Sequence, residues 1–312
     1  MPRVFSLSYE SSGGTLIGFD TWPLRWDDSD LQNYSWKVST VKRTSGYGSK
    51  ITDISREATS KKIKLKICDY GNDVAVYTNY LASVFEPDVI AKTPGKLWIN
   101  DSYTSGFITG MDLGKRIERQ YLELTLTFAT EYPFWITEDL HTFAPLEEGS
   151  ATGFILPTAL PMAIVAPSSR QLVNDHYSAC SAIITMYGPV SDPEFSLGSH
   201  VYSVTGSLSP GDRIEIDQKA KTVTKISSSG ERLNFFYARG KTYSVFEPIP
   251  AGENYITYSN DFTFEILLLK ERSDPEWTSL PVDGGETLNV WTGTAAEFAL
   301  ITPVAGTVYF VE

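Results

Sequence analysis

The run Leu122-Glu123-Leu124-Thr125-Leu126-Thr127-Phe128 alternates apolar and polar side chains without a break. Successive side chains of a strand point to opposite faces, so this period of two predicts a strand with one buried face. A second run, Lys62-Ile63-Lys64-Leu65-Lys66-Ile67, alternates in the same way. Together the two runs predict that the first half of the chain is rich in β-structure.

One helix is expected between these two strands. Over residues 72–86, apolar side chains recur at spacings near three and four, at Val76, Tyr80, Leu81, Val84 and Phe85. Pro87 follows directly, and proline disrupts a helix interior, so we expect the helix to end before it. Such a helix would cover one open sheet or one end of a barrel.

The second half shows the same period of two in short runs separated by Gly, Pro, Asn and Asp. The runs are residues 181–187, 213–217, 221–226 and 262–268. Strands at this spacing without helices between them predict an antiparallel sandwich. The polar stretch Asp217-Gln218-Lys219-Ala220 predicts a tight hairpin between two of the runs.

The boundary between the halves is expected between about Glu138 and Gln171, where prolines and glycines break every regular pattern. The apolar part of this stretch, residues 154–167, is too short and too broken by proline to span a bilayer. The first residues lack the apolar run of a secretory signal. After Ser273, residues 287–291 and 307–310 look like extra strands or an arm, and the pattern does not separate these two alternatives.

Composition narrows the function further. The 312 residues are 42% hydrophobic and 21% charged, with a net charge of -12, so the chain can bury a core. A chain of this sign repels phosphate backbones, which argues against tight non-specific nucleic-acid binding. Two cysteines, Cys68 and Cys180, are too few for a disulfide scaffold or a cysteine-ligated zinc site. We interpret both as ordinary buried thiols.

No arrangement of residues predicts catalysis. Histidine is the usual base of serine and cysteine hydrolases, and His141, His176 and His200 all fall in expected linker or turn sequence. A pairing of His176 with Cys180 is conceivable, but an exposed loop histidine is the favoured interpretation.

Three acidic or glycine-rich clusters have simpler interpretations than a catalytic, calcium-binding or phosphate-binding site. The carboxylates Asp212, Glu215 and Asp217 fit the solvated outer face of a strand better than a glycosidase pair. The run Asp27-Asp28-Ser29-Asp30 fits a loop or cap better than a calcium site. Gly46 and Gly48 predict a flexible loop without a phosphate-binding signature. We therefore predict no catalytic, cofactor-binding or metal-binding residue and no cofactor.

Aromatic side chains are abundant, with 7 Trp, 17 Tyr and 16 Phe. Trp22, Trp26 and Trp36 cluster near the start of the chain, where packing in a core or between subunits is favoured over a ligand platform. If the second domain binds sugar, Trp277 and Trp291 are the candidate stacking residues.

The order of these segments resembles the distal tail protein family of long-tailed bacteriophages. In the first half the resemblance rests on the Gly46 loop, the strand through residues 62–68, the helix ending in residues 81–87 and the run at residues 124–135. In the second half it rests on residues 188–195, 208–217, 221–223 and 249–256. The chain departs from the family in the Gly46 loop, which lacks proline and arginine, and after Ser273, where no counterpart is found.

The resemblance implies a mainly β fold. Residues 1–140 would be a ring-forming β-barrel or β-sandwich domain with one helix, and residues 141–170 a linker. Residues 171–312 would be a galectin-like antiparallel β-sandwich with a C-terminal extension.

The resemblance also implies a structural hub of a siphophage tail tip or baseplate, and not an enzyme. A homo-oligomeric, hexameric ring would join the tail tube protein to the tip protein and anchor receptor-binding proteins. DNA would pass through a lumen lined by acidic N-terminal residues without specific binding. The protein would be located at the tail tip of the virion, after assembly in the host cytoplasm and without membrane anchoring. The alternative is a carbohydrate-binding β-sandwich module used in adhesion to the host surface.

Overall fold

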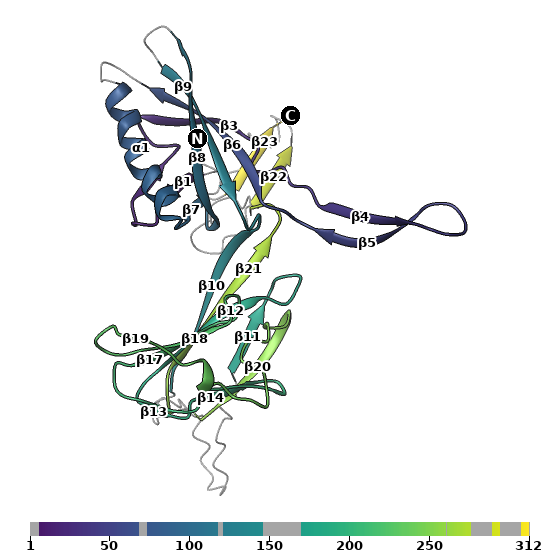
Figure 1. Cartoon of the computed structure of the whole chain (residues 1–312), viewed down its shortest axis with the longest axis vertical. Coiled ribbons are helices and arrows are strands. Elements are labelled where there is room, and N and C mark those ends of the chain that lie inside the picture. Colours follow the sequence, from purple (N-terminus) through teal and green to yellow (C-terminus); the bar gives the residue numbers. More distant parts are fainter. Residues whose placement is uncertain are drawn as a thin grey trace, which may run out of the picture.

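Two β-rich bodies are joined by a pair of long strands, and one hairpin projects sideways from the first body (Figure 1). The computed structural model describes residues 6–68, 74–117, 121–145, 170–259 and 261–275, and the backbone of residues 289–293 and 307–311. The expected mainly β fold is confirmed, with one α-helix among the described residues.

The first body is built from one continuous set of paired strands and a separate two-stranded hairpin, β4 with β5. Its elements are β1 (Leu7–Glu10), β2 (Leu16–Gly18), β3 (Leu24–Ser29), β4 (Lys37–Lys42), β5 (Ser49–Ser55), β6 (Thr59–Cys68), α1 (Val74–Ala91), β7 (Gly95–Ile99), β8 (Ser102–Ile117) and β9 (Tyr121–Thr130). Strand β8 pairs first with β7 and then with β9, which pairs with β6, and β6 with β3. Strand β8 therefore connects the part of the sheet that contains β7 with the part that contains β9.

The two alternating runs of the sequence are the centre of that sheet. Strands β6 and β9 pair antiparallel, with Ile63 opposite Leu126 and Leu65 opposite Leu124. These four side chains are buried in the first core, while the lysines between them lie on the other face. The strands predicted at residues 62–67 and 122–128 are confirmed, because one face of each is buried as the alternation requires.

Helix α1 runs past Pro87 to Ala91, so the expectation that it ends before the proline is wrong. Asp88, which is 1% exposed, links the helical turn after Pro87 to residues outside the helix. Its carboxylate accepts hydrogen bonds from the Tyr9 hydroxyl at 2.6 Å and from the Ser12 amide at 3.0 Å. Phe85 packs edge-on against the Tyr9 ring at 5.3 Å. These contacts offset the backbone hydrogen bond that proline cannot donate. None of the described helices is long and apolar enough to cross a membrane.

The second body is a sandwich of two antiparallel sheets. Its strands are β11 (Arg170–Asn174), β12 (Ser181–Tyr187), β13 (Val190–Ser191), β14 (Glu194–Leu197), β15 (His200–Ser203), β16 (Ser207–Leu208), β17 (Arg213–Asp217), β18 (Thr222–Ile226), β19 (Arg232–Asn234), β20 (Gly252–Tyr258) and β21 (Phe264–Arg272), with a 3-10 turn η1 (Phe236–Ala238). One sheet has the order β19-β18-β17-β12-β21 and the other β11-β20-β14-β15. The antiparallel sandwich predicted for the second half is confirmed.

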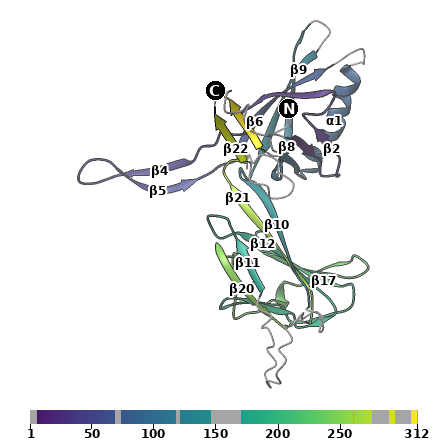
Figure 2. The ribbon, with the colours of Figure 1, turned by 180° about the vertical axis from the view of Figure 1, so that it is seen from behind.

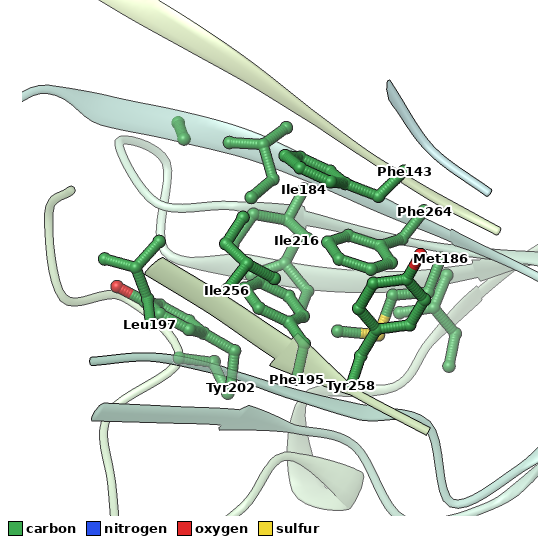
Figure 3. Packing of buried hydrophobic residues seen from close by; sticks show 14 of the residues in the cluster. Phe143, Ile184, Met186, Phe195, Leu197, Tyr202, Ile216, Ile256, Tyr258 and Phe264 are labelled. Carbon is green, nitrogen blue, oxygen red and sulfur yellow. The ribbon is translucent and has the colours of Figure 1, made fainter. Parts of the chain in front are cut away.

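Stacked aromatic rings form the centre of the sandwich (Figure 3). Phe195 of one sheet stacks on Phe264 of the other with ring centroids 4.6 Å apart, and Phe143 stacks on Phe264 at 5.0 Å. The predicted hairpin after Asp217 is also confirmed. The Asp217 carboxylate accepts hydrogen bonds from the amides of Lys219 and Ala220, which fixes the turn.

Strand β10 (Trp135–Phe143) connects the two bodies. It pairs with β21 at nine positions, and near its start it also pairs with β8. Trp135 lies in the core of the first body and Phe143 in the core of the second. Figure 2 shows the two strands running from one body into the other. A single ladder is thus shared by both cores.

Polar contacts reinforce this junction. The Tyr132 hydroxyl donates to the Glu271 carboxylate at 2.5 Å, and Lys219 forms an ion pair with the same carboxylate at 2.9 Å. The Lys219 ammonium also lies 3.6 Å from the centre of the Tyr132 ring. Tyr132 comes from the first body and its two partners from the second, so the bodies are held by side chains as well as by backbone.

Most of the expected linker, residues 146–169, lies outside the described residues. Near the end of the chain, β22 (Asn289–Gly293) and β23 (Thr307–Val311) pair in parallel with each other. The β-like pieces predicted after Ser273 therefore include two strands.

Replacing Asp88 by Ala should destabilise the fold by on the order of 2 to 3 kcal/mol, because the buried Tyr9 hydroxyl then loses its acceptor. Urea unfolding measures the change. Tyr9→Phe is the matched control and should cost about 1 kcal/mol, since Asp88 keeps its bonds to Ser12. Equal stability of Asp88→Ala and the native chain would contradict this account of how α1 continues past Pro87.

Candidate assembly surfaces

The three histidines are dispersed and each has a local partner. His141 lies in β10, with Nε2 3.1 Å from Asp139, and His200 lies in β15, with Nε2 2.8 Å from the carbonyl of Ser244. The expectation that both lie in linker or turn sequence is wrong, because β10 continues to Phe143, past the expected start of the linker, and His200 begins a strand of four residues. His176 does lie in a turn, between β11 and β12.

The conceivable pair of Cys180 with His176 is not formed. The Cys180 thiol lies 3.5 Å from the side-chain oxygen of Asn174 and 3.6 Å from the carbonyl of Ser178. Burial raises the pKa of the Cys180 thiol, which disfavours the thiolate that a nucleophile needs. Cys180 is thus a buried structural thiol as expected, whereas Cys68 is only partly buried.

The carboxylates near the β17–β18 hairpin are structural. Glu215 pairs with Arg232 at 3.0 Å on the outer face of β17, and Asp217 fixes the turn. Asp212 is 8% exposed, which differs from the expected solvated face. It accepts hydrogen bonds from the backbone amides of Ser228 and Ser209, and these lower its pKa, with a further contribution from Lys225.

The acidic run after Trp26 belongs to strand β3, so the expected loop or cap is wrong for Asp27 and Asp28. Asp27 pairs with Lys66 at 2.5 Å and Asp28 with Lys64 at 3.2 Å, both on the neighbouring strand β6. The Asp30 carboxylate accepts a hydrogen bond from the backbone amide of Lys62. Asp27 and Asp28 therefore neutralise two of the lysines of β6, Lys66 and Lys64. In the part of the chain that the structure describes, no group of three or more His, Cys, Asp or Glu could hold a metal ion.

The early tryptophans separate into two kinds. Trp26 packs against the first core, whereas Trp22 is 61% and Trp36 45% exposed. The side chains of Trp277 and Trp291, the candidate sugar platforms, lie outside the described residues.

The largest unpartnered feature is the hairpin of β4 and β5, which we call the arm and define as residues 37–55. It projects away from the first body (Figures 1 and 2), and almost all of its residues are exposed. The predicted flexible loop at Gly46 and Gly48 is its turn, where both glycines have positive φ angles. Each leg of the arm reaches roughly 30 Å at about 3.3 Å per residue.

One face of the arm is apolar. Val38 pairs with Ile54, and Thr40 with Ile51, so these side chains share a face of the ribbon. Val38 is 49% exposed, and Ile51 and Ile54 are each 55% exposed. Neither strand was predicted from the sequence. Val38 and Val41 are three positions apart, as are Ile51 and Ile54, so the period of two is absent, and a register shift between Ser39 and Thr40 accompanies this spacing. The remaining signal is the recurrence of Val and Ile on either side of a glycine-containing loop.

A pocket of about 400 Å³ lies at the base of the arm, and Arg56 forms one of its walls. The guanidinium carbon of Arg56 is 4.8 Å from the ring centre of Phe134, 5.5 Å from that of Trp36 and 5.7 Å from that of Tyr34. No pattern in the sequence singles out this arginine, because its aromatic partners come from separate segments.

These features define a class of protein: a two-body β scaffold joined by one shared ladder, with an exposed arm that has one apolar face and, in the described residues, no metal-binding cluster. No protein-family model and no curated protein sequence matches the chain. The identity of the scaffold therefore rests on comparison with solved structures.

The chain is similar to the Dit protein of phage SPP1, described as a paradigm of the hub adsorption apparatus in phages that infect Gram-positive bacteria. The TM-score is 0.58 at 13% identity, covering 86% of this chain and 100% of that one. It is also similar to a chain of the phage P2 baseplate in its activated conformation with Ca, with a TM-score of 0.57 at 12% identity, covering 87% and 99%. The same baseplate with Sr gives a TM-score of 0.55 at 12% identity. The chain thus has the Dit-like fold of phage tail tips, and the resemblance predicted from its motifs is confirmed for the fold.

The Cys180 thiol should react slowly with a disulfide reagent at pH 7 and faster as the pH rises, because burial raises its pKa and the thiolate is the reactive form. The measurement is a stopped-flow thiol titration of the Cys68→Ser variant, in which Cys180 is the remaining cysteine. The urea-unfolded variant is the control and should react at the rate of a free cysteine. Rapid reaction of the folded protein at pH 6 would contradict a structural role and reopen the pairing with His176.

Proposed function

We propose that this protein is the structural hub of a siphophage tail tip. A hexameric ring of copies joins the tail tube to the tip protein and anchors receptor-binding proteins, and DNA passes through its lumen. The ring is located in the virion and assembles in the host cytoplasm. The first body, within residues 1–140, forms the ring, and the galectin-like sandwich within residues 171–312 faces the docking proteins.

The observation that carries this proposal is the exposed arm on a Dit-like fold. A two-stranded hairpin is marginally stable by itself in water, and this one leaves Val38, Ile51 and Ile54 in solvent. Its two open edges also leave backbone hydrogen-bonding groups without strand partners. Another copy of the chain can cover both the apolar face and the edges.

Charge favours a second copy as that partner. Residues 37–61, the arm and its base, contain six basic and two acidic residues, a net charge of +4. Since the whole chain carries -12, the residues outside this segment carry -16. A basic arm is therefore attracted to the acidic body of a neighbour. The same acidic excess allows DNA to move through a bore without sticking, because it repels phosphate groups.

Geometry favours a ring over a simple dimer. The arm and the body surface that receives it are different parts of the chain, so the contact is heterologous. Heterologous contacts generate closed rings when the rotation between copies closes, and filaments when it does not. The rigid ladder between β10 and β21 fixes the sandwich relative to the ring-forming body, so each copy presents its sandwich in the same direction.

Replacing Ile51 and Ile54 together by Thr should weaken ring assembly by on the order of tenfold or more, because two apolar side chains no longer lose solvent contact on assembly. Threonine keeps the branched shape that strands favour, so the single chain should unfold at an unchanged temperature. Mass photometry over a dilution series, alone and after co-expression with the tail tube protein, measures the assembly.

Leu233→Thr is the matched control, since Leu233 is 46% exposed on β19 of the sandwich, away from the arm. It should leave assembly unchanged. Single copies under every condition, or a ring indifferent to the double substitution, would count against the arm as the ring contact. Micromolar binding to a glycan array by a protein that remains single would instead favour the carbohydrate-binding alternative.

A further inference from the structure

Arg56 is held in an unusual electrostatic position at the base of the arm. Three aromatic rings surround its guanidinium, and its Nη1 atom is buried without a hydrogen-bond partner. Burial also lowers the pKa of Arg56. Guanidinium groups taken from water are normally paired with an acceptor, because an unpaired buried charge is costly. The stacked rings fix the orientation of the group and supply no acceptor for its N–H bonds.

The carboxylate that lines the pocket is already engaged. Glu57, the next residue, forms an ion pair with Lys37 at the base of the arm. Lys61, which also lines the pocket, is directed to the backbone carbonyls of Asp30 and Asn33. Burial lowers the pKa of Lys61, and the positive charge of Arg56 lowers it further. Three cations therefore line the pocket, and the one carboxylate in its lining, Glu57, is paired with Lys37, which leaves Arg56 and Lys61 without a carboxylate from the lining.

We propose that this pocket is a socket for a carboxylate side chain of a second copy of the chain. The inference rests on the proposed ring, and it names the contact that locks each arm after the apolar face has docked. A guanidinium presents parallel N–H donors that fit the two oxygens of a carboxylate, and here the rings hold the donors in place before the partner arrives.

Charge complementarity selects a second copy as the source of the carboxylate. All charged residues that line the pocket lie within the segment of net charge +4, while the rest of each copy carries -16. The pocket is also continuous with the arm, so any copy that covers the arm brings its acidic surface to the socket. The acid enters a partly desolvated site, where a charged hydrogen bond is stronger than on an open surface.

Arg56→Met tests the socket, because methionine keeps a long apolar side chain against the aromatic rings and removes the charge and the donors. The folded single chain loses no hydrogen bond at Nη1, so its thermal unfolding should not weaken, whereas ring assembly should weaken about tenfold or more. Arg43→Met on the arm turn is the matched control for loss of one positive charge and should change assembly far less. Mass photometry and thermal unfolding provide the two readouts.

A second variant identifies the acid. In Arg56→Lys, a carbodiimide can join the new amine to a carboxylate in the socket, and mixing copies labelled with ¹⁴N and ¹⁵N reveals bonds between copies by mass spectrometry. We expect a mixed-isotope peptide pair that joins residue 56 to an acidic peptide. The Lys37–Glu57 pair gives the internal control, since its cross-link stays within one copy.

The experimental outcomes distinguish failure of the socket proposal from failure of the proposed ring. Rings that form normally with Arg56→Met and give no mixed-isotope pair at residue 56 would overturn the socket and leave the proposed function standing. A cross-link confined to one copy would overturn it as well. Absence of rings under all conditions would overturn both. If Arg56→Met fails to fold, the Arg56→Lys cross-link still decides the matter.

Discussion

The ladder between β10 and β21 constrains the whole molecule, because the same strand supplies a residue to each core. Trp135 at the start of β10 is buried in the first body, and Phe143 at its end is buried in the sandwich. Tilting one body against the other would break consecutive backbone hydrogen bonds and pull an aromatic ring from a packed core. The bond between Tyr132 and Glu271 resists the same motion from the side. The proposed hub role would require such a fixed connection between the two bodies.

The sequence predicted the features that depend on local pattern. Alternation over residues 62–67 and 122–128 was sufficient for β6 and β9, since one face of each strand is buried and the other is not. Alternation and local sequence signals failed where a residue far away in the chain determines whether a helix or strand forms. Helix α1 continues past Pro87 because Asp88 binds Tyr9, which lies far away in the chain. Asp27 belongs to a strand because Lys66 on β6 neutralises it.

The assembly surfaces were the least predictable part. The glycines at positions 46 and 48 predicted a flexible loop, and a loop lies there, but the strands on either side bury little in the single chain, so the usual alternation of buried and exposed residues is absent. Arg56 carries no local signal, because the rings of Trp36 and Phe134 reach it from different segments. The position of Arg56 is therefore visible in the three-dimensional arrangement of its neighbours and not in the local sequence.

Cryo-electron microscopy of the purified protein, together with its tail tube protein where assembly requires it, tests the central claim most directly. The account predicts a closed hexameric ring in which the arm of each copy lies on the body of the next and an acidic side chain occupies the pocket beside Arg56. Closed rings whose arms project freely into solvent, or single copies in every preparation including intact particles, would contradict it.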